Sequence, residues 1–183
     1  MRVIGGVARG LTLRGPAGMD ARPTSELVRS AIFSILEPMG VEGARVLDLY
    51  AGSGALGIEA LSRGAAWCDF VESNLRQCSI LKANLAITGF ASRSHVYAAR
   101  VERALTFLSG SYGFILMDPP YSFPTLDDTL EGIGGSSLIA SSSVAAVEHS
   151  KRLRLKPGYG AFALMLSRRY GDTTVDFFRV GGI

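Results

Sequence analysis

Two short segments of this 183-residue sequence carry residue types that could bind a ligand and act on it. The first is the segment Asp48–Gly57, in which glycines at 52, 54 and 57 follow a short apolar run. Glycines lack a β-carbon, so a ligand can approach the backbone closely, and GxGxxG spacing is typical of a turn between a strand and a helix. Because this spacing serves several adenosine-containing cofactors, the glycines alone leave the ligand open.

Two acidic residues narrow the choice of cofactor. Asp48 lies near the end of the apolar run before the glycines, where a carboxylate would repel a pyrophosphate but could attract the ammonium of a methionine moiety. Glu72 ends the next apolar run, where an acid can accept hydrogen bonds from both ribose hydroxyls. We therefore expect S-adenosylmethionine here, held by the residues around the turn: Asp48, Tyr50, Ala51, Gly52, Ser53, Gly54, Gly57 and Glu72.

The second segment, Asp118-Pro119-Pro120-Tyr121, directly follows another apolar run. The carboxylate of Asp118 can accept a hydrogen bond from the amino group of a nucleobase. Proline has no N–H and a fixed φ, so the Pro119 carbonyl can serve as a second acceptor. Tyr121 offers a flat face on which an unstacked base can lie. These four residues predict a catalytic turn that orients a base amine toward a methyl donor.

The elements that position these segments alternate between strand and helix patterns. Apolar strand patterns fall at 45–50, 67–71, 95–98, 114–117, 144–147, 161–167 and 173–179. Helical spacing follows the glycine turn as far as residue 61 and recurs at about 75–87, 101–108 and 125–133. Such alternation predicts a parallel sheet covered on both faces. We expect an α/β fold with a doubly wound, mostly parallel, seven-stranded sheet, in which the last two strands form an antiparallel pair.

The first 40 residues read as an extension before a domain at 41–183. Residues 2–14 predict a short β-hairpin, and a helix is expected from an N-cap at Thr24 onward. The extension carries Arg2, Arg9, Arg22 and Arg29, and a second basic group lies at 151–156 and 168–169. Basic ends around a near-neutral middle suit a polyanionic partner, although a solvated surface would look the same.

Composition excludes several other classes. No apolar run approaches the roughly 20 residues that span a bilayer, and the N-terminus lacks a secretion signal. Cys68 and Cys78 form no CxxC pair and have no histidine cluster nearby, which argues against a metal site and a disulfide framework. We therefore expect a monomeric protein of the cytoplasm that binds neither metal nor membrane.

The motifs resemble those of class I amino-methyltransferases, and more narrowly the RsmD family of 16S ribosomal RNA guanine-N2 methyltransferases. The narrower resemblance rests on Arg2–Gly6, on Arg22-Pro23-Thr24 with Arg29 and Phe33, and on Gly52–Ala65. It covers nearly the whole chain. DPPY alone also occurs in DNA adenine methyltransferases, so the N-terminal segments carry the narrower assignment.

This resemblance implies a Rossmann-like fold, a Thr24-containing lid over the cofactor, and RNA contacts from Arg2, Arg9, Arg22 and Arg29. It implies ribosomal RNA as partner, in the small subunit or an assembly intermediate. One position departs from the family. Arg100, which together with Asp118 completes the expected cofactor site, stands where these enzymes place an acid or amide near the adenine. Either a backbone contact or Glu102 could replace that acid or amide. A nucleic-acid adenine-N6 methyltransferase and a non-catalytic RNA-binding protein on the same fold are the alternatives.

Overall fold

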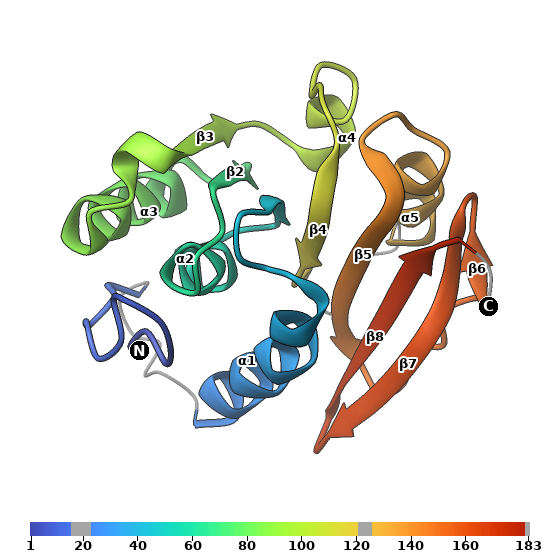
Figure 1. The fold of residues 1–183 in the computed structure, drawn as a ribbon, viewed down its shortest axis with the longest axis horizontal. Helices are drawn as coiled ribbons and strands as arrows, with labels where there is room; N and C mark the ends of the chain where they lie inside the picture. Colours follow the sequence, from blue (N-terminus) through green and yellow to red (C-terminus); the bar gives the residue numbers. More distant parts are fainter. Residues whose placement is uncertain (16–22, 121–125, 182–183) are drawn as a thin grey trace.

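The computed structural model describes residues 1–15, 23–120 and 126–181, with the backbone alone for 23–25. Its centre is one eight-stranded sheet with the order β3-β2-β1-β4-β5-β8-β7-β6 (Figure 1). The strands are β1 (Arg45–Leu49), β2 (Trp67–Glu72), β3 (Ser94–Ala98), β4 (Tyr112–Met117), β5 (Ile139–Ser150), β6 (Gly158–Tyr159), β7 (Phe162–Tyr170) and β8 (Thr173–Val180). The first five strands are parallel, and β8 joins β5 antiparallel.

This architecture confirms the predicted α/β class, with one strand more than expected. The extra strand, β6, has two residues and pairs with β7, too short to give a periodic signal. β5 also begins five residues earlier than the apolar run suggested, at Ile139, and its register shifts near its start.

Helices cover both faces of the sheet (Figure 1). On one face lie α1 (Pro23–Leu36), α2 (Ala55–Ser62) and α3 (Leu75–Thr88), whose apolar residues share a core with Val46, Phe70 and Leu116. On the other lie α4 (Val101–Ala104) and α5 (Leu126–Gly134), packed on Leu47, Ile115 and Val147. Two 3-10 turns, η1 (Glu37–Met39) and η2 (Ala91–Arg93), complete the elements. No helix in the described residues is long and apolar enough to cross a membrane.

The strand order reverses between β1 and β4, which defines where a ligand can bind. Chain connections from β1 lead outward to β2 and β3, and the chain then returns to β4 on the opposite side of β1. In open parallel sheets, such a reversal leaves a crevice beyond the carboxyl ends of the strands. The segments that follow β1 and β4 are the two segments with predicted chemistry, so the topology brings them together.

The N-terminal segment is less regular than the predicted hairpin. Arg2 and Thr12 form a single antiparallel bridge, supported by backbone bonds from Val3 to Leu11 and from Gly10 to Val3. Val3 and Leu13 are buried in the same core as α1 and α2. α1 begins at Pro23 and not after an N-cap at Thr24, because proline is favoured in the first turn, where its missing N–H has no partner to lose.

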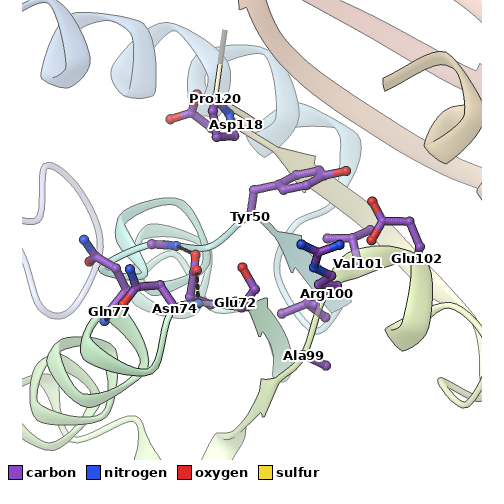
Figure 2. A pocket seen from close by; sticks show the side chains of 13 residues that line it. Tyr50, Glu72, Asn74, Gln77, Ala99, Arg100, Val101, Glu102, Asp118 and Pro120 are labelled. Atoms are coloured by element: carbon purple, nitrogen blue, oxygen red, sulfur yellow. Dashed lines mark hydrogen bonds between the residues drawn. The ribbon is translucent and has the colours of Figure 1, made fainter. Parts of the chain in front are cut away.

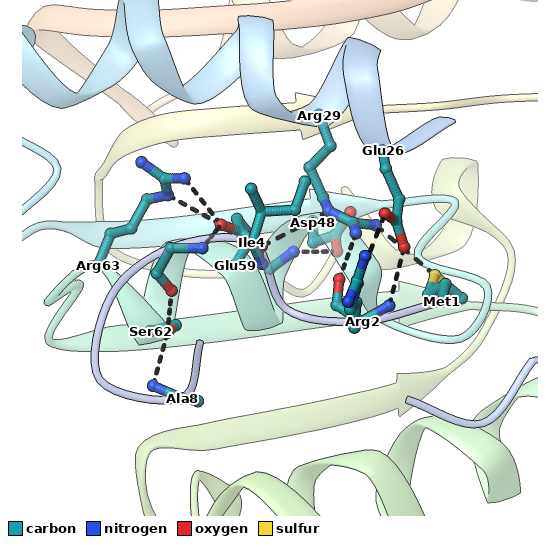
Figure 3. A network of polar contacts seen from close by, with 12 residues as sticks. Met1, Arg2, Ile4, Ala8, Glu26, Arg29, Asp48, Glu59, Ser62 and Arg63 are labelled. Carbon is teal, nitrogen blue, oxygen red and sulfur yellow. Dashed lines mark hydrogen bonds and ion pairs between the residues drawn. The ribbon is translucent and has the colours of Figure 1, made fainter. Parts of the chain in front are cut away.

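A buried acid on α2, Glu59, holds the N-terminal segment in place (Figure 3). Its carboxylate accepts backbone N–H bonds from Ile4 at 2.9 Å and from Gly5 at 2.7 Å. The same carboxylate pairs with Arg63 at 2.9 Å and with Arg29 at 3.5 Å. Glu59 is 1% exposed, so its charge depends on these partners in place of water.

The position of Arg29 corrects the prediction that it contacts RNA. Its side chain is 4% exposed, and it donates to the carbonyl of Arg2 at 2.6 Å. Burial lowers the pKa of Arg29, and the charges of Glu59 and Glu26 oppose that shift. Arg29 joins α1 to the N-terminal segment because its guanidinium fits between Glu59 and a backbone carbonyl.

We expect Glu59→Gln to lower the free energy of unfolding by about 3–5 kcal/mol, because it leaves the buried guanidinium of Arg29 without its acid, whereas Arg63 keeps Glu37. Urea unfolding followed by circular dichroism measures the change. Glu42→Gln, at an exposed position, is the matched control and should leave the midpoint nearly unchanged. Equal midpoints for the two variants would contradict the role assigned to Glu59.

Candidate functional site

A cavity of about 750 Å³ lies at the carboxyl ends of the central strands (Figure 2). Asp118 and Pro120 approach it from one side, and Glu72, Asn74 and Gln77 from another. The residues that line it come from the ends of β1, β2, β3 and β4: Tyr50, Gly52, Val71, Glu72, Ser73, Asn74, Gln77, Ala99, Arg100, Val101, Glu102, Asp118 and Pro120. The cavity therefore occupies the crevice at the point where the strand order reverses.

The glycine turn between β1 and α2 is shaped by close packing. Gly54 has φ of 86°, and a β-carbon there would lie 2.0 Å from Cδ1 of the buried Leu81. At Gly57, a β-carbon would lie 2.3 Å from the ring of Phe70, so α2 can approach β2 only without a side chain here. Glycine is therefore required at 54 and at 57 because α2 packs closely on α3 and on β2 at these two positions.

Glu72 is fixed by two backbone amides, one in the glycine turn and one at the start of α3. One carboxylate oxygen accepts the N–H of Gly52 at 2.8 Å, and the other accepts the N–H of Asn74 at 2.7 Å. Asn74 is the N-cap of α3, where its side chain accepts from Arg76 and Gln77. A carboxylate held by two N–H groups keeps lone pairs directed into the cavity, where they can accept from the two hydroxyls of a ribose.

Asp48 lies beneath the turn and does not line the cavity. It is 1% exposed, and its carboxylate accepts the N–H of Gly57 at 2.8 Å in the first turn of α2. Burial raises the pKa of Asp48 to about 8, with smaller contributions from the charges of Asp118 and Glu72. The carboxylate of Asp48 therefore contacts the first turn of α2. Its predicted contact with a ligand ammonium stays a prediction.

Asp118 follows β4 directly and is exposed at the mouth of the cavity. The protein around its carboxyl group disfavours the charge and raises the pKa of Asp118 to about 6. Pro119 is buried and Pro120 lines the cavity. Tyr121 lies outside the described residues, as do Arg22 and the side chain of Thr24.

Glu148, near the end of β5, is an acidic residue that the sequence reasoning missed. It is half-buried, and burial together with the charge of Asp118 raises its pKa to about 8. The apolar run before it, Val144–Val147, followed by an acid at the strand end, is the same signal that identified Asp48 and Glu72.

The carboxyl groups at this edge of the sheet favour a cationic ligand. Asp118 raises the pKa of both Asp48 and Glu148, so these groups disfavour one another's charge. A ligand with positive charge relieves that repulsion, whereas a pyrophosphate adds to it. No group of three or more acidic, histidine or cysteine residues in the described parts of the chain could hold a metal ion.

Tyr50 and Arg100 occupy the side of the cavity opposite α3 (Figure 2). Tyr50 has φ of 60°, unusual for a residue with a side chain, and its hydroxyl lies 3.1 Å from that of Thr129 on α5. Arg100, which is exposed, lines the cavity together with Glu102. Arg100, at the position that departs from the family, and Glu102 are therefore both accessible to a ligand.

The structure brings together part of the predicted site. Of the residues predicted to hold the cofactor, Tyr50, Gly52, Glu72, Arg100 and Asp118 line the cavity. Ala51, Ser53, Gly54 and Gly57 shape the turn without lining it, as does Asp48 below it. Sequence reasoning missed Asn74 and Gln77, although an asparagine two residues after a strand is a recognisable helix start.

The exposed arginines lie on the N-terminal segment. Arg2 has a side chain that is 69% exposed and a long ion pair of 4.0 Å with Glu26. Arg9 is exposed in the turn between the bridged residues. Both side chains are therefore accessible to a polyanion, in contrast to Arg29.

The parallel sheet with its reversal between β1 and β4, the antiparallel strands β7 and β8 at its end, and the glycine turn define the class I methyltransferase fold. The solved structure of yhhF, a candidate methyltransferase from Escherichia coli, matches with a TM-score of 0.87 and 30% identity, covering 98% of this chain and 97% of that one.

Sequence comparison gives the family. The model of the family described as Conserved hypothetical protein 95 matches residues 1–179. YlbH of Bacillus subtilis, a candidate rRNA methyltransferase, is 35% identical over 185 residues, with both chains fully covered. Ribosomal RNA small subunit methyltransferase D of E. coli K12 is 34% identical over 148 residues, covering 81% of this chain and 74% of the relative. The chain belongs to this family, the RsmD family.

The raised pKa of Asp48 gives a pH-dependent stability. The folded protein holds the proton of Asp48 more tightly than the unfolded chain does, because the pKa of this carboxyl group in the unfolded chain is the ordinary 3.8. The resulting stabilisation is complete below about pH 4 and is lost as the pH rises through about 8. We expect Asp48→Asn to flatten the fall in unfolding free energy over this range, measured by urea unfolding of the ligand-free protein at several pH values.

Asp128→Asn on the exposed side of α5 is the control and should keep the parental slope. If Asp48→Asn shows the same pH slope as the parent protein, Asp48 is ionised in the folded state and the assignment fails.

Proposed function

We propose that this protein transfers a methyl group from S-adenosylmethionine to the exocyclic N2 of a guanine in 16S ribosomal RNA. The observation that carries the proposal is the shared cavity. Asp118 and Pro120 line the same space as Gly52 and Glu72, so an acceptor for a base amine and an acceptor for a ribose face one ligand site.

The residues present fit this cofactor. Glu72 offers acceptors to the ribose hydroxyls, and the acidic edge of the sheet suits a molecule with an ammonium and a sulfonium. In this proposal the ammonium of the methionine end lowers the pKa of Asp48, so that the carboxyl group below the turn is ionised when the cofactor is bound. When bound, the cofactor supplies an electrophilic methyl group, whose bond to sulfur breaks with the electron pair left on sulfur as the bond to nitrogen forms.

The chain orients the base and holds its amine. Asp118 and the Pro119 carbonyl accept hydrogen bonds from the two amino N–H groups, and these bonds direct the nitrogen lone pair toward the methyl group. The nitrogen loses one proton as it bonds to carbon, and Asp118 is the acceptor beside it. Such a reaction gains most from positioning and from stabilisation of developing charge. Tyr121 holds the target by stacking, which requires a base that is flipped out or unpaired.

The proposed substrate rests on the relatives and on exposed charge. The E. coli relative is named for the small ribosomal subunit RNA, and YlbH for rRNA. Residues 1–40 would contact RNA through Arg2 and Arg9 and close over the cofactor through Arg22 and Thr24. We propose a monomer in the cytoplasm that acts on the small subunit or an assembly intermediate.

Replacing Asp118 tests the chemistry. We expect Asp118→Ala to lower the single-turnover rate of methyl transfer by at least about 100-fold, because the lost hydrogen bond acts where charge develops. Labelled cofactor with rRNA or small-subunit particles measures the rate. Cofactor binding, followed by calorimetry, should survive, and NAD should not bind.

Asp128→Ala, an exposed acid on α5, is the control and should transfer at the parental rate. An Asp118→Ala protein as fast as the parent would show that the turn is only structural. Mass spectrometry of rRNA nucleosides from cells with and without the gene separates N2-methylguanine from N6-methyladenine, and absence of any change would favour a non-catalytic protein.

The exposed arginines give a second expectation. Arg2→Ala and Arg9→Ala should each weaken RNA binding and reduce the slope of log affinity against log salt by about one unit. Filter binding at several salt concentrations measures the slope. Arg179→Ala is the control, because it is exposed beside Val144 at the opposite edge of the sheet. An unchanged slope in the Arg2→Ala and Arg9→Ala double variant would show that neither arginine contacts RNA.

A further inference from the structure

Glu148 is an acidic residue near the end of β5 that has no polar partner among the described residues. Within the described parts of the chain, its side chain forms no hydrogen bond or ion pair. Its neighbours on the same face of β5, Val144 and Ala146, are apolar, and Val175 lies opposite on β8. Half-burial of an unpaired carboxyl group costs free energy, so packing alone would favour an apolar residue here.

Strand register places Glu148 beside Asp118. β4 and β5 are parallel, with Met117 opposite Val147, so the next residue of each strand reaches the same edge of the sheet. Adjacent strands lie about 4.8 Å apart. Asp118 and Glu148 are therefore neighbours at the carboxyl ends of two paired strands.

Side-chain alternation places Glu148 on the face of the sheet that α1 covers. Val147 packs on the α5 side, so Glu148 points to the α1 side, where its cross-strand neighbour Val175 also packs. Asp48 follows the same alternation from Val46 and Leu47. Asp118 follows Met117 in the same way, and β4 lies between β1 and β5, so Asp118 lies between Asp48 and Glu148.

Glu148 thus lies on the far side of Asp118 from the cofactor cavity, which it does not line. If Asp118 holds the amine of the target base, the rest of that base extends away from the cofactor, toward β5. A guanine presents N1–H next to its N2 amino group, whereas adenine presents a lone pair at N1 next to its N6 amino group. A hydrogen bond from N1–H lowers the pKa of Glu148 and favours its charged form, which would repel the lone pair of adenine.

We propose that Glu148 is a specificity-determining residue that accepts the N1–H of the target guanine. The inference rests on the proposed function and deepens it, since it names the group that separates guanine from adenine. Glu148 and Asp118 together match the adjacent donors on one edge of guanine. Asp118 serves the reacting nitrogen, and Glu148 serves the ring nitrogen next to it.

The test uses an RNA in which 2-aminopurine replaces the target guanine that mass spectrometry identifies. This base keeps the reacting 2-amino group but has a lone pair in place of N1–H. We expect the parent protein to methylate the guanine RNA at least about tenfold faster in single-turnover assays. In Glu148→Gln, the amide can donate to the lone pair, so the guanine rate should fall and the preference should shrink by about tenfold or reverse.

Three controls keep the outcome decisive. Glu131→Gln, an exposed acid on α5, should retain the parental preference. Calorimetry should show parental cofactor affinity in Glu148→Gln, and thermal melting should show that it folds. A purely structural role would lower both rates by the same factor and leave the preference unchanged, which would overturn the inference.

The failure of the proposed function has a different signature. If the parent protein methylates adenine, or no base at all, the proposed guanine-N2 transfer is wrong before Glu148 is tested. A parent protein that methylates guanine, with a Glu148→Gln preference equal to its own, leaves the function intact and removes only the assignment of Glu148.

Discussion

The structure depends on a concentration of acidic groups at the carboxyl ends of β1, β2, β4 and β5. Burial and the charge of Asp118 raise the pKa values of Asp48 and Glu148, and the protein around Asp118 raises the pKa of Asp118 itself. The N–H of Gly57 opposes the raised pKa of Asp48, and the N–H groups of Gly52 and Asn74 hold the carboxylate of Glu72 in place. The turn therefore organises the acids, and the acids in turn select a ligand with positive charge.

The N-terminal segment shows how the same chain uses charge for folding. Glu59 collects two arginines and two backbone amides at one buried carboxylate, so residues far apart in sequence meet on α2. Arginines in this extension thus divide into a buried set, with Arg29, and an exposed set, with Arg2 and Arg9. Only the exposed set is available to an external polyanion.

The sequence could predict those features that are local along the chain. An acid at the end of an apolar run marked Asp48, Glu72 and Asp118, because strand periodicity and strand ends are local signals. The burial of Arg29 could not be predicted in this way, since it depends on Glu59, which lies 30 positions later and meets Arg29 only after α1 and α2 pack. The same holds for Asp48, whose contact with Gly57 and absence from the cavity follow from the packing of α2 on β2.

One buried side chain ties the N-terminal segment to the glycine turn. Asn84 on α3 is fully buried, accepts the N–H of Arg14, and donates to the carbonyls of Arg14 and of Ser53. The segment cannot detach without leaving the amide of Asn84 unsatisfied in the core beside the turn. Opening of the first 14 residues is therefore coupled to order in the turn through Asn84, so we expect a ligand that orders the turn also to slow amide exchange in the N-terminal segment.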